Sequence, residues 1–91
     1  MVAMVMNLEV DDYDEFNKRF DADPGGRKGI AKGHTVSRNV EHPNDVFIRT
    51  EYASVEDAEK VRRQLLDSGA LSNFTVKTPP TIIEIADQAT Y

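Results

Sequence analysis

Cysteine and tryptophan are both absent from this 91-residue chain, and each absence narrows what the protein can be. Without cysteine there is no disulfide framework, no cysteine-ligated zinc site and no thiol nucleophile. No apolar run approaches the roughly 20 residues that a membrane-spanning helix needs. The opening stretch Met1–Met6 carries no basic residue and is not typical of a signal peptide. We therefore expect a cytoplasmic protein with no membrane partner.

Positive charge is also scarce. The chain has 11 Lys and Arg residues against 16 Asp and Glu residues, which gives a net charge of −5. Because an acidic chain is a poor partner for nucleic acid, we expect no nucleic-acid binding. The two histidines, His34 and His42, match no metal-ligand spacing, so we expect no metal site.

The length fits one domain over residues 1–91. A chain of this size buries about 60–65 % of the surface that its unfolded form exposes. Its hydrophobic core is therefore adequate but small, and a second subunit would enlarge it.

Hydrophobic periodicity predicts four strands and two helices. The strands are expected at 2–10, 34–40, 46–52 and 81–86, and the helices at 13–21 and from Ser54 to near Gly69. A short helical piece is expected at 24–31, and a connecting stretch that is partly extended at 71–77. Pro79 and Pro80 cannot lie in a central strand, because proline lacks the backbone donor that a strand ladder uses.

The order strand, helix, strand, strand, helix, strand is typical of ferredoxin-like α+β domains. It predicts a four-stranded antiparallel sheet with both helices on one face. The opposite face then carries apolar and charged side chains together, which suits a protein interface better than a solvated surface. The candidate interface residues are Val5, Glu9, Phe47, Arg49 and Glu51. We expect a twofold homodimer through this face; the alternative is a monomer with a solvated sheet.

Four polar side chains are candidate pocket residues, and each has a plainer interpretation. His34 could exchange a proton near neutral pH, or simply bond to backbone or water at a strand edge. Arg38 could hold a carboxylate or phenolate, but the register of the hairpin decides which face it occupies. Tyr13 and Tyr52 could line an aromatic pocket, or belong to the core with their hydroxyls bonded there.

Three segments resemble small proteins of the antibiotic-biosynthesis-monooxygenase type, within the dimeric α+β barrel superfamily. The first is Met6–Val10 running into Asp12 and Tyr13. The second is Gly33–Asn39 before Pro43–Asp45. The third is Val46–Tyr52 followed by Ser54–Ala58, in which a strand ending in Glu and an aromatic residue precedes a Ser-capped helix.

This resemblance implies a ferredoxin-like subunit whose sheet packs on its twin to form a barrel. It also implies an oxygenase that needs no cofactor and acts on a small aromatic molecule, with substrate between the first helix and the sheet. Heme-degrading relatives use an Asn on the first strand, matched by Asn7, together with a Trp that this chain lacks. The candidate pocket is thus Asn7, Tyr13, His34, Arg38 and Tyr52. The alternative is a non-catalytic dimer that binds a small molecule or has a structural role.

Overall fold

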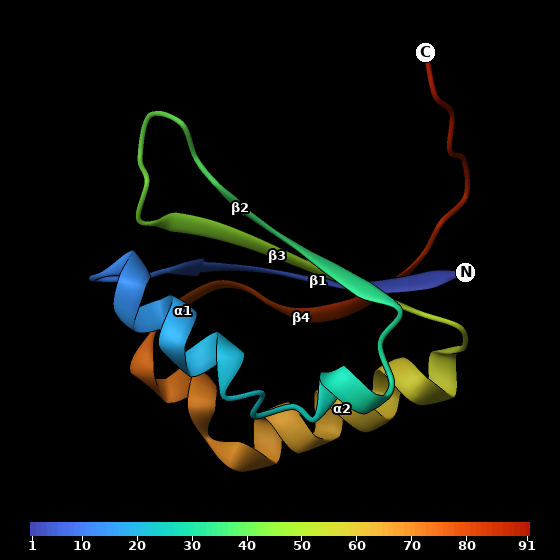
Figure 1. The fold of residues 1–91 in the computed structure, drawn as a ribbon, viewed down its shortest axis with the longest axis horizontal. Coiled ribbons are helices and arrows are strands. Elements are labelled where there is room, and N and C mark those ends of the chain that lie inside the picture. Colours follow the sequence, from blue (N-terminus) through green and yellow to red (C-terminus); the bar gives the residue numbers. More distant parts are fainter.

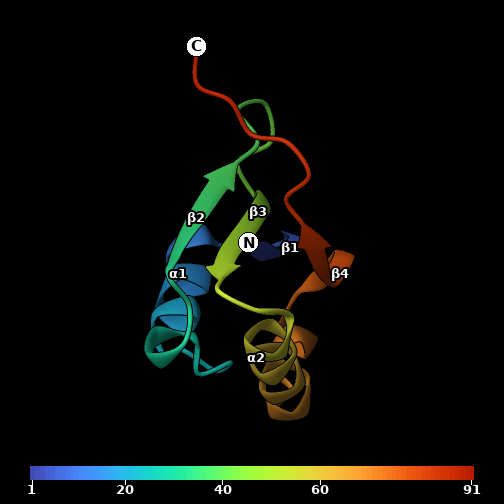
Figure 2. The same cartoon turned by 90° about the vertical axis from the view of Figure 1, so that its right-hand side faces the viewer.

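The computed structural model describes all 91 residues. The chain forms a four-stranded sheet and two helices. The elements are β1 (Val2–Glu9), α1 (Tyr13–Asp21), β2 (Gly33–Arg38), β3 (Asp45–Tyr52), α2 (Val55–Ser68) and β4 (Thr75–Glu84), with 3₁₀ turns at Arg27–Gly29 and Ala70–Asn73. The sheet order is β2-β3-β1-β4, and every neighbouring pair is antiparallel. Both helices lie on the same side of the sheet (Figures 1 and 2). The predicted ferredoxin-like α+β fold is confirmed.

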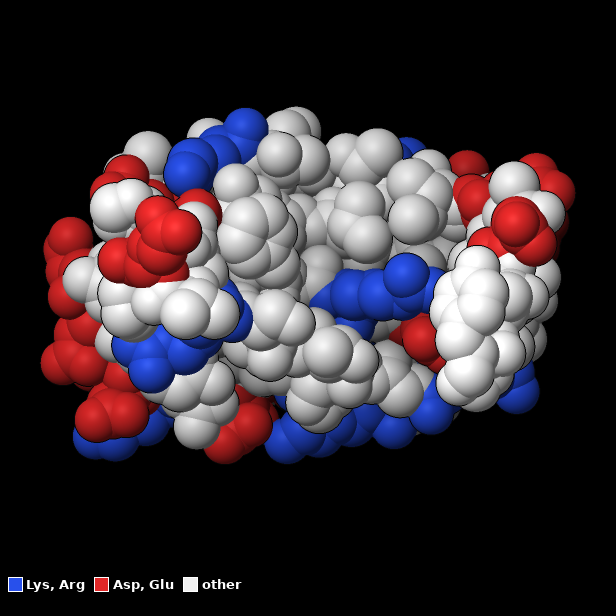
Figure 3. All heavy atoms as spheres, turned by 90° about the horizontal axis from the view of Figure 1, so that it is seen from above, with Lys and Arg blue, Asp and Glu red and all other residues white.

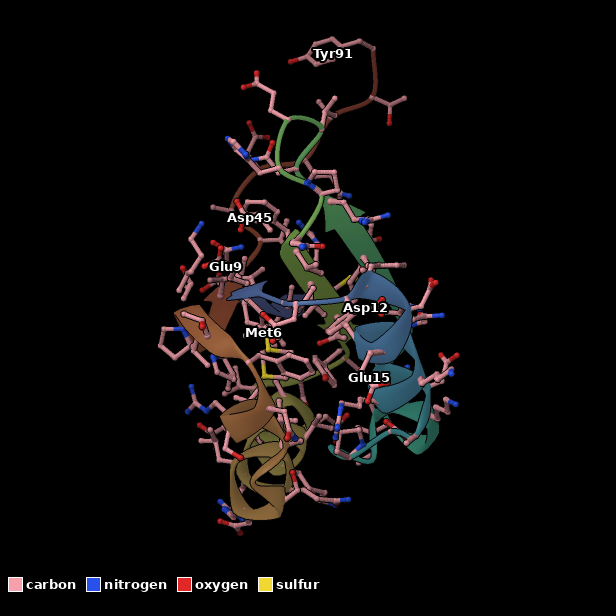
Figure 4. All side chains as sticks on the ribbon, turned by 90° about the vertical axis from the view of Figure 1, so that its left-hand side faces the viewer. Met6, Glu9, Asp12, Glu15, Asp45 and Tyr91 are labelled. Atoms are coloured by element: carbon pink, nitrogen blue, oxygen red, sulfur yellow. The ribbon has the colours of Figure 1, made fainter.

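The hydrophobic core fills the layer between this sheet and the helices. Alternate residues of β1 and β3 face the helices, because side chains of a strand point to opposite faces in turn. α1 contributes one buried residue, Phe16, and α2 contributes a stripe at helical spacing. Figure 4 shows Met6 below the sheet, among the side chains of this layer. The core consists of Val2, Met4, Met6, Leu8, Val10, Phe16, Val46, Ile48, Tyr52, Ala58, Val61 and Leu65.

Capping residues set the ends of both helices, as the sequence predicts. The Asp12 carboxylate accepts the backbone N–H of Asp14 at 2.9 Å, and the Ser54 hydroxyl accepts that of Asp57 at 3.2 Å. These bonds satisfy N–H groups that have no partner inside the helix. α2 ends at Gly69, whose φ of 73° lies in the left-handed region that glycine adopts without strain.

The last strand begins six residues earlier than its predicted start at Thr81. β4 runs through Pro79 and Pro80 because it is an edge strand, where one side of the backbone needs no ladder partner. Its pairing with β1 shifts register twice, between Val5 and Leu8, and these irregularities accommodate the two prolines. Pro79 and Pro80 do lie outside the central strands, as predicted, but the predicted start of the last strand at Thr81 is wrong.

Two other elements are shorter than predicted. The helical piece expected at 24–31 is reduced to the 3₁₀ turn Arg27–Gly29, since the preceding Gly26 adopts a φ of 69° that no helix continues. β2 ends at Arg38 rather than Val40. There the Asn39 side chain accepts the backbone N–H of Glu41 at 2.9 Å, which turns the chain away from the sheet.

The hairpin register places Arg38 and Arg49 on opposite faces of the sheet. Ser37 pairs with Phe47 and Arg38 pairs with Val46. Because Val46 is buried beneath the sheet, Arg38 shares the face covered by the helices, whereas Arg49 belongs to the open face.

The β2–β3 hairpin loop and the C-terminal segment both rise on the open side of the sheet, at its two ends (Figure 1). Tyr91 lies at the tip of the C-terminal segment (Figure 4). Seen from above, the face between these two projections is hollowed and mostly uncharged, with Lys or Arg atoms near its centre (Figure 3). The open face is thus a trough with two raised ends.

Candidate functional site

The open face carries a hollow of about 340 Å³ that spans three strands and reaches β4. Two rows of paired residues cross the sheet here. One row is Ser37, Phe47, Asn7 and Thr78, and the neighbouring row is Thr35, Arg49, Val5 and Thr81. The hollow is lined by Val5, Met6, Asn7, Thr35, Ser37, Phe47, Ile48, Arg49 and Thr78. It combines an apolar floor with one amide, three hydroxyls and one guanidinium group.

Most of the polar groups in the hollow are free to bind a ligand. The hydroxyls of Thr35, Ser37 and Thr78 make no hydrogen bond within the chain. Arg49 Nε lies 3.6 Å from Glu51 Oε1, and both side chains are more than a third exposed. That distance exceeds the roughly 2.7–2.9 Å of a good charge-assisted hydrogen bond, so this ion pair is weak.

Asn7 has a different role, because its amide nitrogen is fully used inside the protein. Nδ2 donates to Asp45 Oδ1 at 2.7 Å and to the Val46 carbonyl at 3.0 Å. Asp45 also accepts from Asn39 at 3.3 Å, and Lys77 Nζ lies 3.2 Å from Oδ1. The hydrogen bond from Asn7, with smaller contributions from Lys77 and Asn39, outweighs desolvation and holds the pKa of Asp45 below its usual value.

Asp45 and Glu9 are paired at one end of the β1–β3 ladder and lie close together in Figure 4. Both border a second depression on the surface, with Lys77 and the hairpin loop. Apart from Pro43, every side chain that lines it is charged or polar, so it offers few apolar side chains to an organic ligand.

Tyr13 and Arg38 form a contact at the helix-covered face. The Arg38 guanidinium lies over the Tyr13 ring, 4.2 Å from its centroid, and Arg38 Nε donates to the Pro43 carbonyl at 2.8 Å. His34 packs on the same face with its ring against the edge of Phe20, at 5.1 Å between centroids. These contacts stabilise the packing of α1 on β2.

Tyr52 is fully buried, and its hydroxyl accepts a hydrogen bond from Thr50 Oγ1 at 2.9 Å. Burial raises the pKa of the Tyr52 phenol above its ordinary value of 10.0, with the Thr50 hydrogen bond opposing this. At neutral pH the residue is therefore an uncharged part of the core.

The layer between helices and sheet has little empty space. It holds two voids of about 40 Å³ each, both lined by Met6, Phe20, Pro24 and Leu65. Arg27 lines one of these voids. The residue is 6 % exposed, and its guanidinium stacks 3.7 Å from the Phe20 ring centroid and lies 2.9 Å from Asp23 Oδ1. No ligand larger than a few atoms fits this layer as it stands.

The structure does not bring the five candidate pocket residues together. Asn7 is on the open face, whereas Tyr13, His34, Arg38 and Tyr52 are on the helix-covered face. The candidate interface residues do share the open face: Val5, Glu9, Phe47, Arg49 and Glu51. Sequence reasoning missed Thr35, Ser37 and Thr78. The faces of Thr35 and Ser37 could be assigned only once the hairpin register was known. Thr78 lies in the part of β4 that was not predicted as a strand, because Pro79 and Pro80 follow it.

Solved structures with this architecture include proteins described as oxygenases. A variant of SnoaB, a cofactor-independent oxygenase from Streptomyces nogalater, matches with a TM-score of 0.76 at 16 % identity, over 96 % of this chain and 94 % of that one. A candidate antibiotic biosynthesis monooxygenase from Deinococcus radiodurans matches with a TM-score of 0.72 at 14 % identity, over 100 % and 98 %. The chain has the fold of antibiotic biosynthesis monooxygenase-like proteins. The resemblance seen in the sequence is thus confirmed for the fold.

A dimeric ferredoxin-like protein from an uncultured marine organism has the same architecture, with a TM-score of 0.65 at 17 % identity over 99 % of this chain and 98 % of that one. No protein-family model matches the sequence, and no curated protein sequence does. No helix of the structure is both long enough and apolar enough to cross a membrane.

Proposed function

We propose that the protein is a homodimer joined through its open sheet faces, with a small-molecule site between them. Phe47 is 44 % exposed in the single chain, and it lies beside Val5 and Asn7 near the middle of the face. Covering this apolar surface removes it from water, which favours association. The raised hairpin loop and C-terminal segment would flank a second copy. The shared fold with a protein described as dimeric supports this assembly.

The observation that supports the proposed small-molecule site is the difference in volume between the hollow on the open face and the voids under the sheet. The hollow on the open face measures about 340 Å³, whereas each void under the sheet measures about 40 Å³. A second sheet above the hollow would close it and exclude water from the ligand. The mainly apolar lining with a few polar groups is typical of small-molecule sites. Phe47 gives such a ligand an aromatic surface, which favours a small aromatic molecule.

Paired variants test the assembly and the site together. Phe47→Glu places a charge in the centre of the proposed interface, whereas Leu66→Glu changes a residue that is 54 % exposed on α2, on the other side of the sheet. We expect Phe47→Glu to give monomers that no longer bind a naphthalene probe in isothermal titration calorimetry. Leu66→Glu should remain dimeric and bind as the wild type does. A Phe47→Glu protein that stays dimeric and binds the probe would contradict the proposal.

A second candidate function is cofactor-independent oxygenation of the bound aromatic molecule. It is favoured by the fold shared with SnoaB and with other monooxygenase-type proteins. In such a reaction the substrate itself supplies electrons to O₂, so the protein needs to bind, orient and deprotonate a phenol-type substrate. The test is oxygen consumption with hydroxylated polycyclic aromatics and no added cofactor. Turnover that Phe47→Glu abolishes would support catalysis. Binding without turnover would favour the non-catalytic alternative.

A further inference from the structure

We propose that residues 23–31, which join α1 to β2, form a flap that opens as one unit while the sheet and α2 stay folded. Arg27 holds the flap closed. The flap lies on the helix side of the sheet, next to α2 and away from the proposed homodimer interface (Figure 1). It borders a void of about 40 Å³ that Thr50 and Tyr52 of β3 also line. Opening therefore gives solvent and small solutes a path to this buried pair of hydroxyl groups.

The hydrogen bonds of the flap are mostly internal to it. The Asp23 carboxylate accepts the backbone N–H groups of Arg27 at 2.8 Å and of Lys28 at 3.0 Å, and also Arg27 Nη1 at 2.9 Å. No backbone hydrogen bond joins the flap to the sheet or to α2. The first such bond, from Lys32 N–H to the Glu51 carbonyl at 2.7 Å, comes directly after the flap. The internal bonds persist when the flap moves as a unit, so opening leaves most of its polar groups paired.

Few polar contacts hold the flap against the helices. Arg27 Nη1 donates to the Phe20 carbonyl at 2.8 Å, and the guanidinium stacks 3.7 Å from the Phe20 ring centroid. Gln64 of α2 adds one long hydrogen bond, from Nε2 to the Pro24 carbonyl at 3.4 Å. Opening breaks these contacts but returns the buried guanidinium to water, which offsets part of their loss. It can also release backbone strain at Asp23, whose φ of 58° lies in the left-handed region.

The packing of the flap on α2 depends on the missing side chain of Gly25. A methyl group there would lie 3.0 Å from Val61 Cγ1 and 3.4 Å from the Val61 carbonyl oxygen. Because the helix backbone and a buried valine cannot move far, such a methyl group would push the flap outward. Gly29 lies in the same flap, and a methyl group at that position would meet no atom within 4 Å. The two glycines therefore supply a disruptive substitution and its matched control.

A single introduced thiol reports the opening, because the chain has no cysteine. Thr50→Cys places the thiol beside the void, whereas Val46→Cys places it on the same face of β3 but away from the void; these residues are 3 % and 0 % exposed. Alkylation by iodoacetamide, followed by intact mass, measures how often each thiol meets solvent. We expect Thr50→Cys to react at least about tenfold faster than its global unfolding allows, with little dependence on low concentrations of urea. Val46→Cys should react only through global unfolding, with a steep urea dependence.

Further substitutions in the Thr50→Cys protein assign the reactivity to the flap. Gly25→Ala should raise the alkylation rate by about tenfold, because it disfavours the closed position. Gly29→Ala should leave the rate within about twofold. Gln64→Ala changes an exposed side chain on α2, removes its bond to the flap and should raise the rate by about threefold. The free energy of unfolding of each variant is measured by urea denaturation, so that global and local opening are separated.

Two results would overturn the proposal. The first is a Thr50→Cys thiol that reacts no faster than global unfolding allows, with the same steep urea dependence as Val46→Cys. The second is a fast reaction that Gly25→Ala and Gln64→Ala both leave unchanged, because a motion elsewhere would then expose the thiol. Fast reaction of Thr50→Cys that Gly25→Ala accelerates and Gly29→Ala does not would support the flap.

Discussion

Asn7 on β1 donates its amide to Asp45 Oδ1 at 2.7 Å, which joins the centre of the sheet to the first residue of β3. The same carboxylate contacts Lys77 on β4, so three strands meet at this one group. The hairpin loop begins next to it, where Asn39 donates to the other carboxylate oxygen. The contacts of Asp45 therefore hold together the end of the open face and the base of the β2–β3 hairpin loop.

The first prediction concerns acid stability. The pKa of Asp45 is lowered in the folded protein, so its ionised form stabilises the fold above the unfolded-state pKa near 3.8, and this contribution is lost as the pH falls through the lower folded-state value. Asp45→Asn should therefore be less stable than the wild type at neutral pH. The difference in free energy of unfolding should shrink progressively below about pH 5.

Urea denaturation across this pH range measures the effect. Glu41→Gln is the control, because Glu41 is an exposed acid in the same hairpin with no ion pair. Its stability should follow the wild type at every pH. A difference between Asp45→Asn and the wild type that stays constant through acid pH would contradict the role of the Asp45 charge.

The second prediction concerns the buried hydroxyl pair. Tyr52→Phe removes the acceptor of the Thr50 hydrogen bond and leaves a buried hydroxyl without a partner. We expect the free energy of unfolding to fall by about 1–2 kcal/mol. Tyr13→Phe, whose hydroxyl makes no hydrogen bond within the chain, should change it by less than about 0.5 kcal/mol. Equal effects of the two substitutions in urea denaturation would count against the buried bond.

The third prediction concerns the buried ion pair of Arg27 and Asp23. Arg27→Met keeps an apolar side chain of similar length but leaves the Asp23 carboxylate, 16 % exposed, without its cation. We expect a loss of about 3 kcal/mol in the free energy of unfolding. Lys28→Met removes a neighbouring exposed charge and should cost less than about 0.5 kcal/mol. A cost for Arg27→Met as small as that of the control would show that the pair contributes little.

Periodicity and caps were sufficient to predict the architecture. The alternation in β1 and β3 correctly predicted which side chains face the helices, because burial on one face alone leaves a period of two in the sequence. Asp12, Ser54 and Gly69 marked helix ends because the backbone groups there need specific partners or a left-handed φ. The start of β4 was predicted least well. A strand tolerates Pro79 only because it lies at the edge of the sheet, and no local sequence pattern reveals that position.

The site was harder to predict than the fold. Which face Arg38 occupies depends on a one-residue choice of hairpin register, and the pairing of Arg38 with Val46 became known only from the structure. Asn7 and Tyr13 looked like partners in one pocket, yet the sheet separates them. The hollow itself arises from two rows of side chains contributed by four strands, so it becomes visible only when those strands are paired.

In the proposed homodimer, the open sheet face of one chain meets that of a second copy. Size-exclusion chromatography with light scattering, over about a tenfold dilution from micromolar concentration, measures this directly. We expect a mass near twice the 10.2 kDa of one chain, unchanged across the dilution. A mass that stays at 10.2 kDa at the highest concentration would contradict it and would leave the hollow as a site open to solvent.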